Sequence, residues 1–317
     1  MFITGALGFL GRALADRLTA GGTTVRGVDL VADPGRDVVA GDISRPGPWQ
    51  AHAAGCELVL HTAAVVSNAV GAAEQWRVNV VGTRRVLDAA KAAGARRFVL
   101  FSSVRAFGDT GFPDGVDETW PVRPDGNPYV DTKIAAEQVA LQAHAAGEIA
   151  VTVVRPADVY GPRSRPWTVL PLWFIRRRRF VLPAQGLGVF SPVYVDDLVA
   201  GVLKAATADR AAGQVFTLAA GGVTCAEFFG HYYRMLGRTG PRGTSTRTAV
   251  ALAEAAGRAE RLLGRRTESN AASVRYLART GTYSAAKAAD LLGWVPTVDL
   301  ADGMGRTEDW LRAEGLL

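Results

Sequence analysis

Short apolar runs alternate with longer amphipathic stretches along the first half of the chain. The runs predict strands at 1–4, 24–30, 58–64, 96–103 and 149–156. Apolar positions at helical spacing predict helices over 11–20, 73–93 and 127–146, each followed by a glycine. Strands that alternate with helices usually run parallel, with helices on both faces of the sheet. The pattern therefore predicts an α/β fold with a doubly wound parallel sheet.

The pattern changes after about residue 161, where prolines and arginines become frequent. Residues 224–275 are expected to be helical and basic. We expect residues 1–162 to form the sheet domain and residues 163–317 a smaller, mostly helical C-terminal lobe. Segments near 190–220 are expected to return to the sheet domain.

Three glycines follow the first predicted strand at a fixed spacing. Gly5, Gly8 and Gly11 form G-x-x-G-x-x-G between a strand and a helix. One glycine permits a tight turn, one lets the backbone approach a pyrophosphate, and one lets helix and strand pack closely. The helix N-terminus then faces the phosphates with its partial positive charge. This context predicts a dinucleotide-binding turn of Rossmann type, although the strand before it is short.

An acidic residue at the end of the second strand bears on the choice of dinucleotide. Asp29 lies 18 residues beyond Gly11, where a carboxylate accepts hydrogen bonds from ribose hydroxyls and repels a 2′-phosphate. No arginine follows it directly, so NAD is favoured over NADP. The alternative is that Asp29 is only a surface residue at a strand end. Asp42 and Ile43, after the next strand, are expected to lie beside the adenine.

A tyrosine and a lysine in the third predicted helix point to acid–base chemistry. Tyr129 and Lys133 are four residues apart and therefore share one helix face. A free tyrosine is a poor base at neutral pH, but an adjacent ammonium favours the phenolate. The lysine can also hold the nicotinamide ribose. Ser103 ends the preceding strand, where its hydroxyl can bind a substrate oxygen.

Composition narrows the class of protein. The chain has 317 residues, of which 48% are hydrophobic and 21% charged, as in a globular cytoplasmic protein. Cys56 and Cys225 cannot form a disulfide framework and are expected to be reduced and buried. The four histidines have no ligand spacing, so no metal site is expected.

A net charge of +6 is compatible with nucleic-acid binding. However, the arginines are dispersed and no aromatic residues are interleaved with them, which speaks against it. The densest cluster, Arg176 to Arg179, is interpreted as a solvated helix end, with contact to an anion or a membrane surface as the alternative. No apolar run is long enough to span a membrane.

The chain resembles the extended short-chain dehydrogenases/reductases, a group that includes NAD-dependent epimerases and dehydratases and 3β-hydroxysteroid dehydrogenases. The matching stretches are TGALGFLG, GDI, HTAA, NVVGTRRVLDAA, SSVRAFG, YVDTK, RPADVYGP, VYVDDLV and LLGWVP. The resemblance implies an NAD-binding domain followed by a substrate-binding lobe. It implies that Ser103, Tyr129 and Lys133 are catalytic. The cofactor contacts expected besides the glycines are Leu7, Phe9, Leu10, Ala63, Ala64, Asn79, Tyr129, Lys133, Pro156 and Val159. For Asn79, a bond to nearby backbone is the alternative.

Two positions depart from the pattern of relatives that act on nucleotide sugars. Asp158 stands where those relatives usually carry an asparagine, and Phe190-Ser191 stands where they usually carry an arginine for the diphosphate. An acid repels a diphosphate and a phenylalanine cannot neutralise it, so an uncharged, apolar substrate is expected. Four aromatic residues are expected mainly in the core, with a role in lining such a pocket as the alternative: Trp167, Trp173, Phe174 and Phe180. Arg163 and Arg165 keep the nucleotide-sugar alternative open.

We therefore expect an NAD-dependent oxidoreductase that interconverts a secondary alcohol and a ketone on a hydrophobic small molecule. The alternatives are a nucleotide-sugar epimerase or dehydratase and a redox sensor that binds the dinucleotide without catalysis. Retention of Tyr129 and Lys133 speaks against the sensor. By resemblance, a homodimer is expected through the helices that contain Asn79 and Tyr129.

Overall fold

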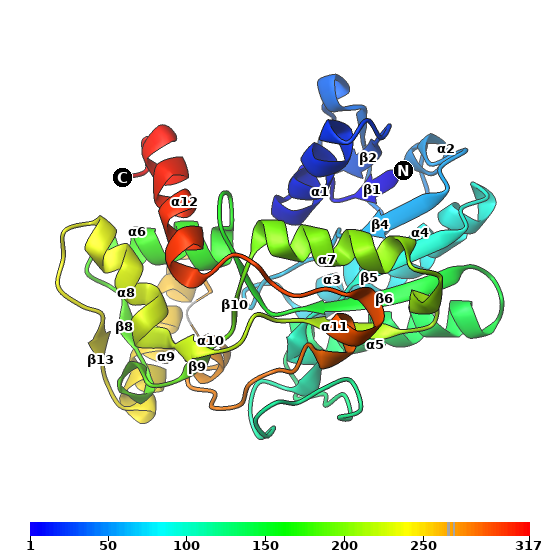
Figure 1. Ribbon diagram of the computed structural model, residues 1–317. Helices are drawn as coiled ribbons and strands as arrows, with labels where there is room; N and C mark the ends of the chain where they lie inside the picture. The colour runs from blue at the N-terminus through cyan, green and yellow to red at the C-terminus, as the bar shows by residue number, and fades with distance from the viewer. Residues whose placement is uncertain (265–266, 269) are drawn as a thin grey trace.

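The sheet at the centre of the protein is parallel throughout. The computed structural model describes residues 1–264, 267–268 and 270–317, and within them seven strands form this sheet in the order β11–β6–β5–β4–β1–β2–β3 (Figure 1). The strands are β1 (Phe2–Thr4), β2 (Arg26–Asp29), β3 (Val38–Ala40), β4 (Leu58–His61), β5 (Arg97–Phe101), β6 (Ala150–Pro156) and β11 (Val215–Leu218). The predicted doubly wound α/β fold is thus confirmed. The order reverses between β1 and β4, and such switch points carry ligand crevices at the carboxyl ends of the strands.

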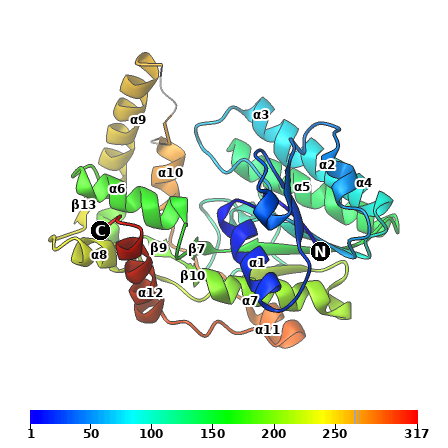
Figure 2. The same cartoon turned by 90° about the horizontal axis from the view of Figure 1, so that it is seen from above.

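Helices cover both faces of the sheet (Figure 2). One face packs against α1 (Phe9–Ala20), α7 (Val195–Thr207) and α11 (Ala286–Leu292). The other face packs against α2 (Trp49–His52), α4 (Gly82–Ala92) and α5 (Pro128–Ala145).

The alternation of side chains along the strands explains why both faces are apolar. Leu60 and Val99 belong to the core cluster on the α1 side, whereas Val59 and Phe98 belong to the cluster on the α5 side. Successive side chains of a strand point to opposite faces, so a strand buried on both faces must be apolar throughout. This is why the strands appear in the sequence as continuous apolar runs.

The helix predicted over 73–93 is interrupted. It consists of α3 (Ala72–Trp76), a π-helical turn (Arg77–Val81) and α4. A π-helical turn rotates the residues that follow it relative to an ideal helix, and such turns occur often at functional sites. Asn79 lies within this turn and is buried. The helical periodicity of residues 73–93 does not indicate this π-helical turn.

The C-terminal part is mostly helical and lies beside the carboxyl ends of the strands (Figure 1). Its helices are α6 (Leu170–Arg176), α8 (Cys225–Met235), α9 (Thr246–Leu262), α10 (Ala271–Tyr276) and α12 (Leu300–Ala313). Short ladders pair β7 (Asp158–Tyr160) with β10 (Pro192–Tyr194), β9 (Val189–Phe190) with β12 (Val223–Thr224), and β8 (Val181–Leu182) with β13 (Arg242–Gly243). Among the described residues, no helix is both long enough and apolar enough to cross a membrane.

A buried ion pair joins α5 to β6. Arg155 donates to Glu137 through two parallel hydrogen bonds of 2.9 and 2.6 Å, and both residues are almost fully buried. The Arg155 guanidinium also lies 4.7 Å from the centre of the Phe107 ring. A bidentate pair of this kind fixes the rotation of α5 against the sheet.

Replacing Glu137 with leucine should destabilise the protein, because it leaves the Arg155 charge buried without a partner. The expected loss is about 3–5 kcal/mol of unfolding free energy in a urea titration. The double variant Glu137→Leu/Arg155→Met is the matched control and should recover most of the loss. A single variant as stable as the wild type would show that the pair does not fix α5.

Candidate active site

The glycine turn between β1 and α1 is closely packed. Gly5 has a φ of +67°, which favours glycine, and its carbonyl accepts a hydrogen bond from the Gly8 N–H (3.0 Å). A Cβ at Gly11 would lie 2.1 Å from the Gly5 carbonyl oxygen, and one at Gly5 would lie 2.9 Å from Ala63 backbone. Helix α1 begins at Phe9 without a side-chain cap, so its first N–H groups remain available to an anion. The turn therefore fits a pyrophosphate.

Asp29 ties the end of β2 to this turn. Its carboxylate accepts hydrogen bonds from the N–H groups of Leu7 (2.9 Å) and Leu30 (2.7 Å). A carboxylate has further lone pairs that can accept from ribose hydroxyls. Leu30 and Val31 beyond it are largely exposed, at 76% and 63%. The structure thus places an acid, followed by apolar side chains, beside the turn.

Asp42 and Ile43 follow β3. The side chain of Asp42 is already hydrogen-bonded, and that of Ile43 is buried. Asp42 accepts from Ser44 and from the Arg77 guanidinium (2.9 Å). Burial alone would raise the pKa of Asp42, but the hydrogen bonds from Ser44 and Arg77 together lower it. The side chain of Ile43 is buried in the core on the α5 side. Any contact of Ile43 with an adenine would therefore be made by its backbone.

Asn79 holds the loop that follows β4. Its Oδ1 accepts from the Val65 N–H (2.7 Å), and its Nδ2 donates to the Val65 carbonyl (3.1 Å) and to Thr132 Oγ1 (3.0 Å). The Ala63 N–H of the same loop donates to Thr4 Oγ1 (3.3 Å), and Ala64 follows in the chain. Asn79 thus positions Ala63 and Ala64 against the glycine turn. Its bonds to the Val65 backbone are of the kind that the sequence analysis considered as the alternative to a cofactor contact.

Ser103, Tyr129 and Lys133 come together at the carboxyl end of β5. Asn127 caps α5 by accepting from the Tyr129 N–H (3.0 Å), which sets Tyr129 in the first helical turn. Lys133, one turn later, donates to the Phe101 carbonyl (2.7 Å), and its Nζ lies 6.0 Å from the centre of the Tyr129 ring. The Ser103 hydroxyl is close enough to the Tyr129 phenol to lower its pKa. A hydroxyl, a phenol and an ammonium therefore share one site, in which Tyr129 and Lys133 are buried.

Burial shifts both titratable groups of this trio. It raises the pKa of Tyr129, while the positive charge of Arg105 and the hydrogen bond with Ser103 oppose the rise. It lowers the pKa of Lys133 to about 8, with the negative charge of Glu137 acting in the opposite direction. A lysine with such a pKa can exchange a proton near neutral pH.

Pro156 and Val159 lie at the carboxyl end of β6 and in β7. Both are buried, and the Val159 carbonyl accepts from Ser164 Oγ (2.9 Å). The Ser102 N–H donates to the Val154 carbonyl (2.8 Å), so the ends of β5 and β6 are adjacent. Pro156 therefore lies at the same edge of the sheet as the trio.

Asp158 is paired within the protein and does not present the repulsive charge that its position in the sequence predicts. Its carboxylate is 1% exposed and accepts from the Ser191 N–H (2.9 Å), from the Tyr276 hydroxyl (2.5 Å) and from the Arg279 guanidinium. Arg279 is fully buried, so Asp158 is neutralised and does not present a free charge to a ligand. No local pattern indicates this partner, which lies 121 residues away.

The aromatic residues of the C-terminal lobe mostly serve the core. Phe190 is fully buried against Phe228 (4.1 Å between ring centres) and against Trp167 (4.9 Å), so it does not face a cavity. Trp167 also stacks on Tyr276. Phe180 packs on Phe229, while Trp173 is 41% exposed with Phe174 and the Arg177 guanidinium against its ring.

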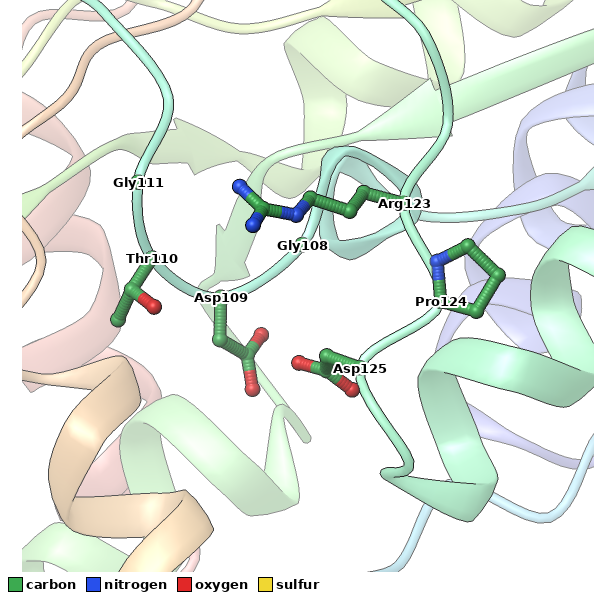
Figure 3. Close-up of a pocket in the computed structure, with 7 residues that line it drawn as sticks. All are labelled: Gly108, Asp109, Thr110, Gly111, Arg123, Pro124 and Asp125. Atoms are coloured by element: carbon green, nitrogen blue, oxygen red, sulfur yellow. The ribbon is translucent and has the colours of Figure 1, made fainter.

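A further ion pair, which no motif in the sequence indicates, adjoins Tyr129. Arg105 and Asp109 form a bidentate pair whose side chains are 12% and 7% exposed. Asp109 also lines a hollow of about 250 Å³ between residues 108–111 and 123–125. In Figure 3 the carboxylates of Asp109 and Asp125 face one another across this hollow.

The segment before α10 reaches across to the loop after β4. Glu268 accepts from Ser67 Oγ (2.6 Å) and from the Asn68 N–H (2.8 Å), and Ser273 Oγ accepts from Asn68 Nδ2 (2.9 Å). These bonds bring α10, and with it Tyr276, over the carboxyl ends of the strands. The C-terminal lobe therefore closes one side of the site.

Known proteins resemble this chain in sequence and fold. Residues 1–219 match the model of the NAD dependent epimerase/dehydratase family. The chain is 34% identical to a 4-hydroxy-2-methyl-3-oxo-4-farnesyl-3,4-dihydroquinoline-1-oxide ketoreductase of Stigmatella aurantiaca, in an alignment that covers 65% of this chain and only 64% of that protein.

Two further similarities extend over nearly the whole chain. It is 28% identical to a dTDP-glucose 4,6-dehydratase of Streptomyces griseus, covering 98% of this chain and 93% of that one. The structure of MoeE5 in complex with UDP-glucose and NAD superposes with a TM-score of 0.78 at 25% identity, covering 99% and 98% of the two chains. The protein thus belongs to the NAD-dependent epimerase/dehydratase family, within the extended short-chain dehydrogenases/reductases.

Proposed function

We propose that this protein is an NAD-dependent oxidoreductase that interconverts a secondary alcohol and a ketone on an uncharged, largely apolar small molecule. The observation that carries the proposal is the grouping of Ser103, Tyr129 and Lys133 at the end of β5. The ketoreductase activity named for the Stigmatella aurantiaca relative supports the same reaction class.

A nicotinamide dinucleotide, when bound, would supply the hydride donor or acceptor. The residues that would hold it are the glycine turn, Asp29, the loop of Ala63 and Ala64, and Lys133. In alcohol oxidation, the Ser103 hydroxyl orients the substrate oxygen and Tyr129 accepts its proton. Lys133 favours the phenolate form of Tyr129, and the Phe101 carbonyl fixes the position of the ammonium.

The buried charges near the trio favour a neutral substrate. Asp109 is paired with Arg105, and Asp158 with Arg279, so each buried acid has a buried cation beside it. Arg105 holds Asp109 through two hydrogen bonds, and Arg279 donates to Asp158, so the oxygens of both acids are engaged within the protein. Elimination of water from a sugar needs an acid and a base besides the tyrosine, and these two carboxylates are poorly placed to serve.

Action on a nucleotide sugar is the second candidate. Similarity over nearly the full length to a dTDP-glucose dehydratase, and to MoeE5, whose structure contains UDP-glucose, supports it. Arg163 and Arg165 are exposed in the C-terminal part and could meet a diphosphate. Binding of a UDP- or dTDP-sugar to the purified protein would favour this candidate over the first.

Turnover of a ketone panel tests the first candidate. We expect NADH-dependent reduction of at least one steroid-like or polyketide ketone, and a Tyr129→Phe variant should lower kcat about 10²- to 10⁴-fold. Tyr283→Phe is the matched control, because the Tyr283 hydroxyl is buried with no hydrogen-bond partner among the described residues, and it should leave kcat near the wild-type value. An inert panel, together with turnover of a nucleotide sugar, would contradict the proposal.

Dinucleotide preference should follow the charge at the end of β2. We expect NAD to bind at least about tenfold more tightly than NADP, a difference of about 1.4 kcal/mol, because Asp29 repels a 2′-phosphate. Calorimetry on the double variant Asp29→Ser/Leu30→Arg should show the preference reduced or reversed, and Leu30→Gln should retain it. Equal affinity of the wild type for both dinucleotides would exclude this role for Asp29.

We also propose a homodimer through α3, α4 and α5, the helices around Asn79 and Tyr129. Trp76 and Val81 are exposed on this side, at 49% and 39%. Light scattering should give about twice the 33.5 kDa mass of the chain, and Trp76→Asp should shift it toward the monomer. Trp173→Asp, at an exposed tryptophan elsewhere, is the control. A monomeric wild type would refute the proposal.

A further inference from the structure

Arg105 lies beside Tyr129, the tyrosine proposed to exchange the substrate proton. It follows Ser103 by two residues, and its N–H donates to Ser103 Oγ (3.2 Å). Its guanidinium carbon lies 5.2 Å from the centre of the Tyr129 ring and 4.9 Å from the centre of the Tyr276 ring. The guanidinium therefore lies against two aromatic rings, one of them the ring of Tyr129.

Asp109 fixes this guanidinium. Arg105 Nε donates to Asp109 Oδ1 (2.6 Å) and Arg105 Nη2 donates to Asp109 Oδ2. Both side chains are nearly buried. A bidentate contact holds the plane and the distance of an arginine, so the charge has a constant position relative to Tyr129.

The charge of Arg105 differs from that of Lys133 in one respect that matters for proton transfer. The pKa of Lys133 is lowered to about 8, so this lysine loses part of its charge as the pH rises toward that value. The pKa of Arg105 is raised: burial would lower it, but the hydrogen bonds and charge of Asp109 outweigh the burial. Arg105 therefore remains a cation at every pH at which an enzyme works.

Other polar groups also surround Tyr129. Ser103 lies close enough to lower its pKa, Lys133 shares its helix, Asp109 adds negative charge behind Arg105, and Tyr276 approaches Arg105 from α10. The neighbouring Asp158–Arg279 pair is neutral as a unit. Of the two cations described here against the Tyr129 ring, Arg105 keeps its charge as the pH rises and Lys133 does not.

We propose that Arg105 is a positioning residue that supports the phenolate of Tyr129 during proton transfer, and that Asp109 sets how much of its charge Tyr129 experiences. The proposal rests on the proposed function, in which Tyr129 exchanges the substrate proton. At about 5 Å in a nearly buried site, a unit charge acts on a phenolate much more strongly than in water.

The test is the titration of Tyr129 in the absence of substrate. The ultraviolet absorbance of phenolate is followed against pH for each protein and for the same protein carrying Tyr129→Phe, and the difference isolates Tyr129. Arg105→Met should raise the midpoint by at least about one pH unit, and Arg105→Lys should bring it back toward the wild-type value. Circular dichroism defines the pH range over which each variant remains folded.

Asp109→Asn provides an independent test that keeps Arg105 in place. Because it removes the opposing negative charge, it should lower the midpoint of Tyr129. An unchanged midpoint in Arg105→Met, or a raised one in Asp109→Asn, would overturn the proposal. If Arg105 only supported the local fold, the variants would lower the melting temperature and leave the midpoint unmoved.

The titration and the turnover assay can fail separately. A Tyr129→Phe variant that keeps full turnover would refute the proposed function, whatever the midpoints are. If Tyr129→Phe loses turnover as expected but Arg105→Met leaves the midpoint of the Tyr129 titration unchanged, only the role of Arg105 is refuted.

Discussion

The carboxyl ends of β1, β4, β5 and β6 meet at one edge of the sheet, and the site depends on this alignment. A parallel sheet brings every βα connection to the same edge. The glycine turn follows β1, the loop held by Asn79 follows β4, Ser103 follows β5, and Pro156 ends β6. The hydrogen bond from Lys133 to the Phe101 carbonyl then links α5 to the end of β5, which sets the helix face that carries Tyr129 and Lys133 against the edge.

Charge compensation is the second organising feature. Glu137 and Arg155, Arg105 and Asp109, and Asp158 and Arg279 are buried as pairs. Each charge would be costly to bury alone, so each pair must persist as a unit. The substrate side of the site consequently has cations and acids nearby but little uncompensated charge. This arrangement supports the proposal that the substrate is a neutral ketone rather than a diphosphate sugar.

Much of the fold was predictable from local sequence, because glycines, apolar runs and helix caps act over a few residues. The five strands given ranges from the sequence, the helix that carries Tyr129 and Lys133, and the glycine turn lie where the pattern placed them, within a few residues, whereas β3 and β11 had no predicted range. The π-helical turn around Asn79 was not predictable, since its periodicity differs only slightly from that of an α-helix. The pairing of Asp158 with Arg279 also escaped, because nothing in a sequence connects two residues so far apart. That pairing reverses the meaning of Asp158, from a repulsive charge to a neutralised one.

Transfer of deuterium tests the central claim most directly. The purified protein is incubated with NADH labelled with deuterium at nicotinamide C4 and with the ketone panel, and the products are examined by mass spectrometry. The account predicts an alcohol that carries deuterium at the former carbonyl carbon, formed as NADH is consumed in equal amount. A nucleotide sugar converted without net consumption of cofactor, beside ketones that remain unlabelled, would contradict it.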